Sequence, residues 1–195
     1  VKGTFWSPKG RYMAFYRMDE TMVDQYPIMD LSKKPAGEEL IRYPMAGKTS
    51  HQVKIGVLES SSKTVIDLKT GLPSDQYLTN VAWSPDERFV YVAVLNREQN
   101  YLKLNEYSAE TGDFIRTLFE EKSSKYVEPE HPMLWVKNHD DQFIWQSEQD
   151  GYNHLYLYNK SGKLMRQLTK GPWVVTDVLA FDEKGEHVFI QATKE

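Results

Sequence analysis

Few residues in this 195-residue chain have the types and spacing that catalysis or metal binding requires. The chain has no cysteine and no Gly-x-Ser-x-Gly motif, so neither a thiol nor a serine of that kind is predicted to act as a nucleophile. Of the five histidines, only His139 has neighbouring carboxylates, those of Asp140 and Asp141. Because Asp and Asn are typical of tight turns, we favour a hairpin turn over a metal site here. No catalytic residue, metal or other cofactor is predicted.

Three further patterns have ordinary structural interpretations. Glu38 and Glu39 are adjacent in a proline-containing stretch, and we interpret them as a solvated charge pair. Asn159-Lys160-Ser161 matches an N-glycosylation acceptor, although three-residue matches are common by chance. Aromatic side chains of this size more often fill a core than form a ligand cage, and we predict core positions for Trp6, Trp83, Trp135 and Trp145.

The composition excludes several classes of protein. The chain has 24 Lys+Arg against 28 Asp+Glu, a net charge of -4 and a pI of about 5.8, which argues against a nucleic-acid backbone as the main partner. The longest apolar run, residues 89–95, is far shorter than the roughly 20 residues that cross a bilayer. A content of 12 Tyr, 8 Phe and 5 Trp favours β-strands.

One landmark recurs along the whole chain. Residues 5–15 (Phe-Trp-Ser-Pro-Lys-Gly-Arg-Tyr-Met-Ala-Phe) match residues 82–92 (Ala-Trp-Ser-Pro-Asp-Glu-Arg-Phe-Val-Tyr-Val), and weaker copies occupy residues 134–144 and 180–189. In each copy an aromatic residue ends one strand, a polar turn follows, and an apolar strand returns. Proline presets φ in such turns, while Gly or Asp tolerates unusual dihedral angles.

A second landmark repeats with a period of about 50 residues. The set Gly162, Leu164, Arg166 and Leu168 returns 50 positions earlier as Gly112, Phe114, Arg116 and Leu118, and again as Ser62, Thr64, Ile66 and Leu68. The first landmark has similar spacings of 52 residues from Trp83 to Trp135 and 46 from Trp135 to Phe181. The 77 residues from Trp6 to Trp83 become 48 when the 29 residues 20–48 are treated as an insertion.

Four short strands in every 40–50 residues are typical of a β-propeller blade. The sequence therefore predicts an all-β fold, a partial β-propeller of antiparallel four-stranded blades with about three and a half blades. The predicted units are residues 4–68 with an inserted arm at 20–48, then 76–118, 131–168 and a partial unit at 174–195. A β-sandwich is the alternative, but a sandwich need not repeat the same turn at the same offset. We interpret the chain as an arc of a larger ring.

Five motifs, in this order and at these separations, resemble one family. It is the N-terminal β-propeller of the dipeptidyl peptidase IV-like serine exopeptidases. The motifs are Arg42-Tyr43-Pro44-Met45-Ala46-Gly47 with the following strand at 53–58, Leu95-Asn96-Arg97-Glu98-Gln99-Asn100, Ser147-Glu148-Gln149-Asp150-Gly151-Tyr152-Asn153-His154-Leu155-Tyr156, Leu168-Thr169-Lys170-Gly171-Pro172-Trp173-Val174-Val175, and the more general opening Trp6-Ser7-Pro8-Lys9-Gly10.

The resemblance implies an eight-bladed propeller stacked on a C-terminal α/β-hydrolase domain. Such enzymes remove an N-terminal dipeptide after Pro or Ala; a Glu pair on the propeller binds the ammonium group of the peptide, and a Ser-Asp-His triad cleaves it. By the family order the Glu pair lies upstream of Val1 and the triad downstream of Glu195. The chain alone is thus expected to be inactive, and its role to be gating and positioning the peptide. The resemblance also implies a periplasmic or secreted location.

One part of the substrate site is expected within the chain. In the resembling family, the segment at residues 125–131 reaches toward the substrate cavity. Tyr126 is the residue that we predict to line it, and the alternative is an ordinary loop tyrosine.

The insertion at residues 20–48 is predicted to be an extended arm. Pro27, Pro35 and Pro44 exclude a long helix, and residues 26–29 and 40–43 are predicted as two limbs around a turn at 33–37. A two-stranded ribbon cannot bury both of its faces, so its apolar side chains need a partner: Ile28, Met29, Leu31, Leu40 and Ile41. The resemblance implies a homodimer formed through this arm. The alternative is an arm folded back on its own propeller or hydrolase.

Two other functions remain open. The chain could be a non-catalytic propeller that binds protein or peptide, or the propeller of a prolyl oligopeptidase or acylaminoacyl peptidase, which should lack the motifs at 42–47 and 147–156. A Gly-x-Ser-x-Gly motif downstream and a Glu pair upstream in the parent gene would distinguish the first interpretation from both.

Overall fold

The computed structural model describes residues 3–194 and contains sixteen β-strands in that range. The strands form three four-stranded sheets and two two-stranded sheets, and every strand pair is antiparallel. Residues 3–194 include no helix, and so none that is long and apolar enough to cross a membrane. The all-β prediction is confirmed.

The sheets follow one another along the chain. The first contains β1 (Thr4–Trp6), β2 (Tyr12–Asp19), β5 (Gln52–Glu59) and β6 (Val65–Asp67). The second contains β7 (Tyr77–Trp83), β8 (Phe89–Leu95), β9 (Tyr101–Ser108) and β10 (Phe114–Lys122), and the third β11 (Leu134–Val136), β12 (His139–Ser147), β13 (His154–Asn159) and β14 (Leu164–Gln167). A two-stranded fourth sheet contains β15 (Val175–Phe181) and β16 (Val188–Ala192), and the arm contains β3 (Gln25–Asp30) and β4 (Gly37–Arg42).

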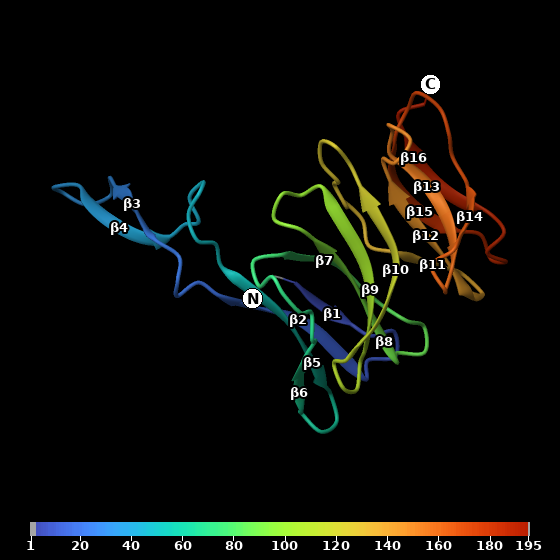
Figure 1. Cartoon of the computed structure of the whole chain (residues 1–195), viewed down its shortest axis with the longest axis horizontal. Coiled ribbons are helices and arrows are strands. Elements are labelled where there is room, and N and C mark those ends of the chain that lie inside the picture. Colours follow the sequence, from blue (N-terminus) through green and yellow to red (C-terminus); the bar gives the residue numbers. More distant parts are fainter. Residues whose placement is uncertain (1–2, 195) are drawn as a thin grey trace.

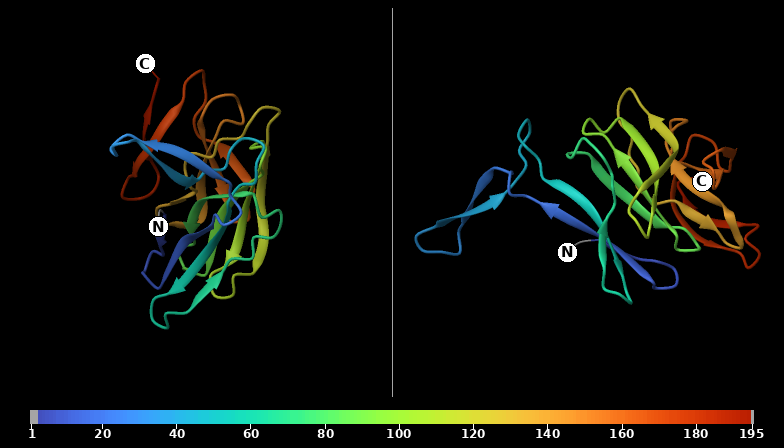
Figure 2. Two further views of the ribbon diagram at one scale, coloured as in Figure 1. Left: turned by 90° about the vertical axis from the view of Figure 1, so that its left-hand side faces the viewer. Right: turned by 60° about the horizontal axis from the view of Figure 1, so that its bottom comes forward.

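Each four-stranded sheet is a meander in which strands adjacent in the sheet follow each other in sequence, apart from the arm inserted between β2 and β5. Figure 1 shows these sheets in succession from the N-terminal to the C-terminal part of the chain, with the arm projecting away from them. The views in Figure 2 show the same succession. The fold is therefore a partial β-propeller, as predicted. Strand β10 continues to Lys122, past the unit boundary predicted at residue 118.

The hydrophobic core is divided into layers between consecutive sheets. The first layer joins the first and second sheets, the second joins the second and third, and the third joins the third and fourth. Strand β8 explains the long apolar run, because Val90, Val92 and Val94 enter the first layer while Tyr91, Ala93 and Leu95 enter the second. A strand covered on both faces has no polar face.

Two indole groups link the first strands of successive sheets. The Nε1–H of Trp83 donates to the carbonyl oxygen of Phe5 at 3.0 Å, and the Nε1–H of Trp135 donates to the carbonyl oxygen of Trp83 at 2.7 Å. Phe181 holds the corresponding place in the fourth sheet, and its side chain has no N–H group. Trp83 is buried as predicted, but Trp6 is 59% exposed.

Antiparallel pairing places the connections at two ends of the sheets. The turn end carries residues 7–11, 60–64, 84–88, 109–113, 137–138, 160–163 and 182–187. The loop end carries residues 20–51 with the arm, 68–76, 96–100, 123–133, 148–153 and 168–174. Every connection of more than six residues between the described strands lies at the loop end.

At the turn end the sheets touch through their main chains. A methyl group on Gly162, whose φ is 88°, would lie 2.1 Å from the carbonyl oxygen of Leu118 in the preceding sheet. In the turn of the second sheet, the left-handed position is held by Glu87, with φ of 64°, and not by the Gly or Asp that the sequence suggested. The Glu87 carboxylate accepts hydrogen bonds of 2.5 Å from the Ser7 hydroxyl and from the Lys9 N–H. These bonds connect the first two sheets.

Two sequence interpretations are corrected in detail. The residue of positive φ in the first sheet's second turn is Lys63, adjacent to the Ser62 that the 50-residue period selected. His139, Asp140 and Asp141 lie in β12, directly after the turn, and the left-handed turn residue is Asn138 with φ of 63°. The Asn138 side chain donates to the carbonyl oxygen of Glu183 at 2.9 Å, so this turn contacts the next sheet.

Candidate functional site

A large hollow lies at the loop end between the first two sheets. This loop-end cavity has a volume of about 660 Å³, and its lining comes from β2, β5 and β7 and from the connections around them. Tyr16 and Met18 continue the face of β2 that carries the buried residues Tyr12 and Ala14. The first core layer fills the space between the first two sheets near the turn end. The cavity is the unfilled part of the same space at the loop end.

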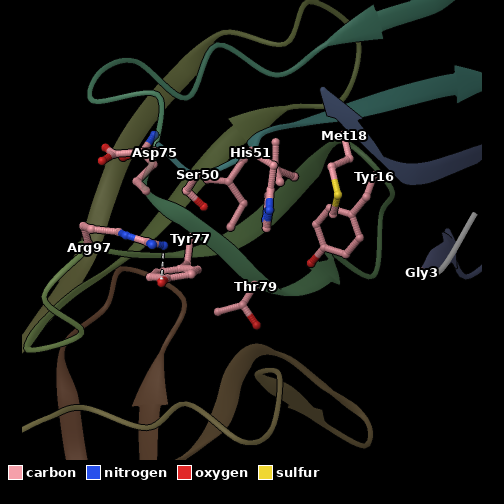
Figure 3. A pocket seen from close by; sticks show the side chains of 12 residues that line it. Gly3, Tyr16, Met18, Ser50, His51, Asp75, Tyr77, Thr79 and Arg97 are labelled. Atoms are coloured by element: carbon pink, nitrogen blue, oxygen red, sulfur yellow. Dashed lines mark hydrogen bonds between the residues drawn. The ribbon is translucent and has the colours of Figure 1, made fainter. Parts of the chain in front are cut away.

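Aromatic and polar groups share the wall of the loop-end cavity, as Figure 3 shows. The guanidinium of Arg97 donates a short hydrogen bond to the Tyr77 hydroxyl and lies 5.2 Å from the centre of that ring. No ion pair within residues 3–194 includes Arg97. Burial raises the pKa of the Tyr16 hydroxyl above its ordinary value.

The groups that line the cavity are of a kind that can bind a ligand. Ser50 and His51 both line it, but no hydrogen bond joins their side chains in the described part of the chain. A serine nucleophile needs a base within hydrogen-bond reach. An aromatic wall with a cationic group at its edge can hold an apolar side chain and orient a polar one.

Tyr126 lies at the same end of the sheets, in the connection between β10 and β11. Its side chain is 55% exposed and lines a hollow of about 190 Å³ between the second and third sheets. Contact of Tyr126 with a substrate stays a prediction. Its position at the loop end places it on the same side of the molecule as the loop-end cavity.

A carboxylate that the sequence did not single out lies in the wall of the Tyr126 hollow. Glu121 accepts a hydrogen bond from the Trp145 Nε1–H at 2.8 Å. Burial raises the pKa of the Glu121 carboxyl, and hydrogen bonds from Ser147 and Trp145 offset only part of that rise. The sequence shows only an acidic pair at the end of a strand, because the burial depends on residues more than 20 positions away.

The arm is an exposed two-stranded ribbon, as predicted. Strands β3 and β4 pair from Gln25 with Arg42 to Asp30 with Gly37. Glu38 and Glu39 are exposed, in agreement with a solvated pair. The apolar residues predicted to need a partner are 43% exposed at Ile28, 68% at Met29, 76% at Leu31 and 55% at Leu40, and Ile41 is half-buried. Figures 1 and 2 show the arm projecting away from the four sheets, so it is not folded back on them.

Two remaining polar patterns have structural roles. The Asn159 side-chain oxygen closes a turn by accepting hydrogen bonds from the N–H groups of Ser161 and Lys163, both at 3.0 Å. Asp182, Glu186 and His187 bring ligand atoms within 4.8 Å of one another. However, Asp182 already accepts hydrogen bonds from the N–H groups of the other two residues, which makes the group a turn network.

Known proteins resemble the chain over nearly its whole length. The model of the dipeptidyl peptidase IV (DPP IV) N-terminal region matches residues 1–195. A probable dipeptidyl peptidase 4 of Aspergillus flavus is 28% identical over 97% of this chain and 26% of its own length. A probable dipeptidyl-aminopeptidase B of Tuber melanosporum is 30% identical over 97% of this chain and 24% of its own length. The chain thus spans about a quarter of these curated relatives.

Solved structures have the same fold. A candidate dipeptidyl aminopeptidase IV of Bacteroides ovatus superimposes with a TM-score of 0.92 and 44% identity, covering 97% of this chain and 30% of that one. Porphyromonas gingivalis dipeptidyl peptidase 4 superimposes with a TM-score of 0.84 and 25% identity, covering 98% and 27%. Together with the family match over the full length, these similarities show that the chain belongs to the dipeptidyl peptidase IV N-terminal region family.

Proposed function

We propose that the chain is the non-catalytic propeller portion of a serine dipeptidyl peptidase that removes N-terminal dipeptides after Pro or Ala. The match of the family model over residues 1–195 carries this proposal. In the proposed division of labour, the C-terminal hydrolase domain of the parent protein cleaves the peptide, and the propeller gates and positions it.

The loop end is the surface that we assign to the peptide. It carries the aromatic loop-end cavity and the exposed Tyr126 side chain. A peptide bound there would be held by aromatic and apolar contacts with Tyr16, Tyr77 and Tyr126, each of which contributes through its large rigid surface.

Turnover of a chromogenic Gly-Pro substrate tests the proposal. The full-length parent should release the dipeptide, and the purified 195-residue chain should not. Replacing Tyr126→Ala in the parent should raise KM by about threefold to tenfold with kcat unchanged, which is the range for one aromatic contact. Phe114→Ala is the matched control, because Phe114 is 49% exposed at the turn end. A parent that binds peptides without turnover would instead favour a non-catalytic binding module.

We also propose that the arm joins two copies of the parent protein. Its exposed apolar side chains need a partner, and in the structure the sheets do not supply one. Deleting residues 24–42 should convert the parent dimer to a monomer in sedimentation. The deletion joins Val23 to Tyr43, and these positions lie near each other, since the Tyr43 N–H donates to the carbonyl oxygen of Asp24, the residue that follows Val23, at 3.2 Å. An unchanged dimer would leave the hydrolase domain as the partner of the arm.

A further inference from the structure

Arg97 is held in place at one end of the loop-end cavity. The connection between β8 and β9 carries it, and the Asn96 side chain closes that connection. The Asn96 Oδ1 accepts hydrogen bonds from the N–H groups of Asn100 and Tyr101, both at 2.9 Å. The Arg97 guanidinium lies over the Tyr77 ring and donates to its hydroxyl. Because a ligand does not have to order a group held in this way, its binding costs less conformational entropy.

Most of the donors of Arg97 are unused. A guanidinium carries five N–H donors, and within residues 3–194 the Arg97 side chain makes one hydrogen bond, to the Tyr77 hydroxyl. Neither Arg97 nor Asp75, an exposed residue of the same lining, takes part in an ion pair in this range. The guanidinium can therefore bind an anion from outside the chain.

Ser50 adds an unused hydroxyl to the same cavity. The residue is 8% exposed and lines the cavity, and its side chain makes no hydrogen bond within residues 3–194. In the described part of the chain, the unpartnered side-chain atoms that are closed to solvent belong to Asn153 and Tyr156. The Ser50 oxygen is thus open to the cavity that its side chain lines. A buried hydroxyl without a partner is uncommon, and this one can donate to a ligand.

The lining favours a carboxylate over other anions. Among the lining residues that the structure describes, Arg97 is the one Arg or Lys, and Asp75 opposes a second negative charge. A dianion such as phosphate is therefore less suited to the cavity than a group with a single charge. The planar guanidinium matches the two oxygens of a carboxylate, and hydrogen bonds of this kind are among the strong ones.

The opposite end of the cavity is suited to an apolar side chain. Figure 3 shows Ser50, Tyr77 and Arg97 toward one end and Tyr16 and Met18 toward the other. An aromatic ring and a thioether both offer polarisable surface to an apolar group. The volume of about 660 Å³ leaves room for such a group beside a carboxylate. A short peptide segment can supply both.

We propose that Arg97 and Ser50 bind a carboxylate group of a peptide held at the loop end. The inference rests on the proposed function, since that function brings a peptide to this end of the sheets. The carboxylate accepts hydrogen bonds from the guanidinium and the hydroxyl, and the neighbouring apolar side chain packs on Tyr16 and Met18. An acidic side chain and the C-terminus of a peptide present the same group. The parent enzyme then prefers substrates that carry a carboxylate at the position reaching this cavity.

Calorimetric titration of the 195-residue chain with three matched peptides tests the inference. All are N-acetylated, proline-containing pentapeptides that end in phenylalanine. The first has glutamate before the phenylalanine and a C-terminal amide, the second has glutamine there and a free C-terminal carboxylate, and the third has glutamine and an amide. The Kd of the first or the second should be at least about tenfold lower than that of the third, in line with hydrogen bonds to a charged group. The peptide that binds more tightly identifies the source of the carboxylate.

Two variants and one control assign the effect to the cavity. Arg97→Gln should remove the preference for a carboxylate, and Ser50→Ala should reduce it by at least about threefold. Arg88→Gln is the matched control, because the Arg88 guanidinium also lies over an aromatic ring, that of Phe89 at 5.4 Å, but at the turn end. It should keep the full preference, and circular dichroism should show that every variant retains its strands.

Equal affinity for the three peptides, or a preference that survives Arg97→Gln, would overturn the inference. Displacement of the carboxylate peptide by inorganic phosphate at equimolar concentration would also count against it. The titration requires no hydrolase domain, and the Gly-Pro substrate of the parent carries no carboxylate. The proposed function and this inference can therefore fail separately.

Discussion

The turn end and the loop end of the sheets differ in how closely neighbouring sheets approach. At the turn end, Gly112 and Gly162 each lie against a carbonyl oxygen of the preceding sheet, and a methyl group on either would lie within 2.4 Å of it. At the loop end, Gly71 and Gly151 have no heavy atom within 4 Å of the same position. The loop end instead has hollows of about 660, 190 and 520 Å³ at the three sheet boundaries.

This difference separates the parts that hold the fold from the parts that can vary. Main-chain contacts at the turn end constrain the spacing of the sheets whatever the neighbouring side chains are. The loop end carries the longer connections and the exposed aromatic and acidic side chains. Binding residues are commonly found on loops that a rigid scaffold positions. Hollows of about 360 and 80 Å³ also occur near the turn end, so the contrast concerns contact and not the mere presence of space.

The largest expected effect is that of adding a methyl group at the tight glycine. Gly162→Ala should lower the free energy of unfolding by about 3 to 4 kcal/mol, from the left-handed φ and from the clash with the preceding sheet. Gly151→Ala shares the positive φ, at 98°, but has open space around it, and it should cost about 1 to 2 kcal/mol. Urea denaturation of both variants measures the difference. Equal costs would show that the turn end is no tighter than the loop end.

The next effect concerns the indole bonds between sheets. Trp135→Phe removes the N–H that donates to the Trp83 carbonyl oxygen at 2.7 Å, and it should destabilise the chain by about 1 to 2 kcal/mol. Trp6→Phe is the matched control, because Trp6 is 59% exposed and its side chain makes no hydrogen bond in residues 3–194. The free energy of unfolding of that variant should stay within about 0.5 kcal/mol of that of the unsubstituted chain. If Trp6→Phe lowers the free energy of unfolding as much as Trp135→Phe does, the stabilising role assigned to the Trp135 indole hydrogen bond is wrong.

A smaller effect on stability is expected from two carboxylates, the buried Glu87 at the turn end and the half-buried Glu121 at the loop end, and the sign of the effect differs between them. Burial alone would raise the pKa of Glu87 at the turn end, but hydrogen bonds from Ser7 and from the N–H groups of Lys9 and Arg11 lower it. Its stabilisation is therefore present above the ordinary pKa of Glu and is lost as the pH falls through the lowered value. Glu87→Gln should cost about 1 kcal/mol at pH 7 and less at pH 4.

Glu121 at the loop end has a raised pKa. The folded state then binds more protons than the unfolded state at intermediate pH, so stability falls as the pH rises through that range. Glu121→Gln keeps an acceptor for the Trp145 N–H and should raise the melting temperature at pH 7, with a gain that fades toward pH 4. Melting curves of both variants at the two pH values are the measurement. A rise in melting temperature from Glu87→Gln at pH 7 would falsify the view that the ionised Glu87 stabilises the fold while the ionised Glu121 destabilises it.

The smallest effect should come from the loop-end cavity. Met18 lines it and is 54% exposed, so Met18→Ser should change the free energy of unfolding by less than about 0.5 kcal/mol. The same urea assay applies. A loss above 1 kcal/mol would mean that the cavity wall belongs to the core.

The repeated turns predicted much of the fold because the same local chemistry occurs in every unit. Trp83 and Trp135 end the first strands of their sheets, and the proline-containing insertion is a two-stranded ribbon. The properties of the site could not be predicted in the same way. The hydrogen bond from Trp145 to Glu121 and the bonds from Ser7 and Lys9 to the Glu87 carboxylate depend on which units face each other. No local pattern reports a contact between residues about 80 positions apart, such as Ser7 with Glu87.

The direction of the indole hydrogen bonds has a consequence for how the chain folds during its synthesis on the ribosome. Each indole donates backward, to a carbonyl of the sheet made before it. The first sheet therefore emerges with the Phe5 acceptor still open, and that acceptor is closed only after Trp83 has left the exit tunnel. Synthesis from the N-terminus thus completes the first and second sheets with a group from the sheet that follows, and a nascent chain that stalls before Trp83 or before Trp135 carries one unfinished boundary.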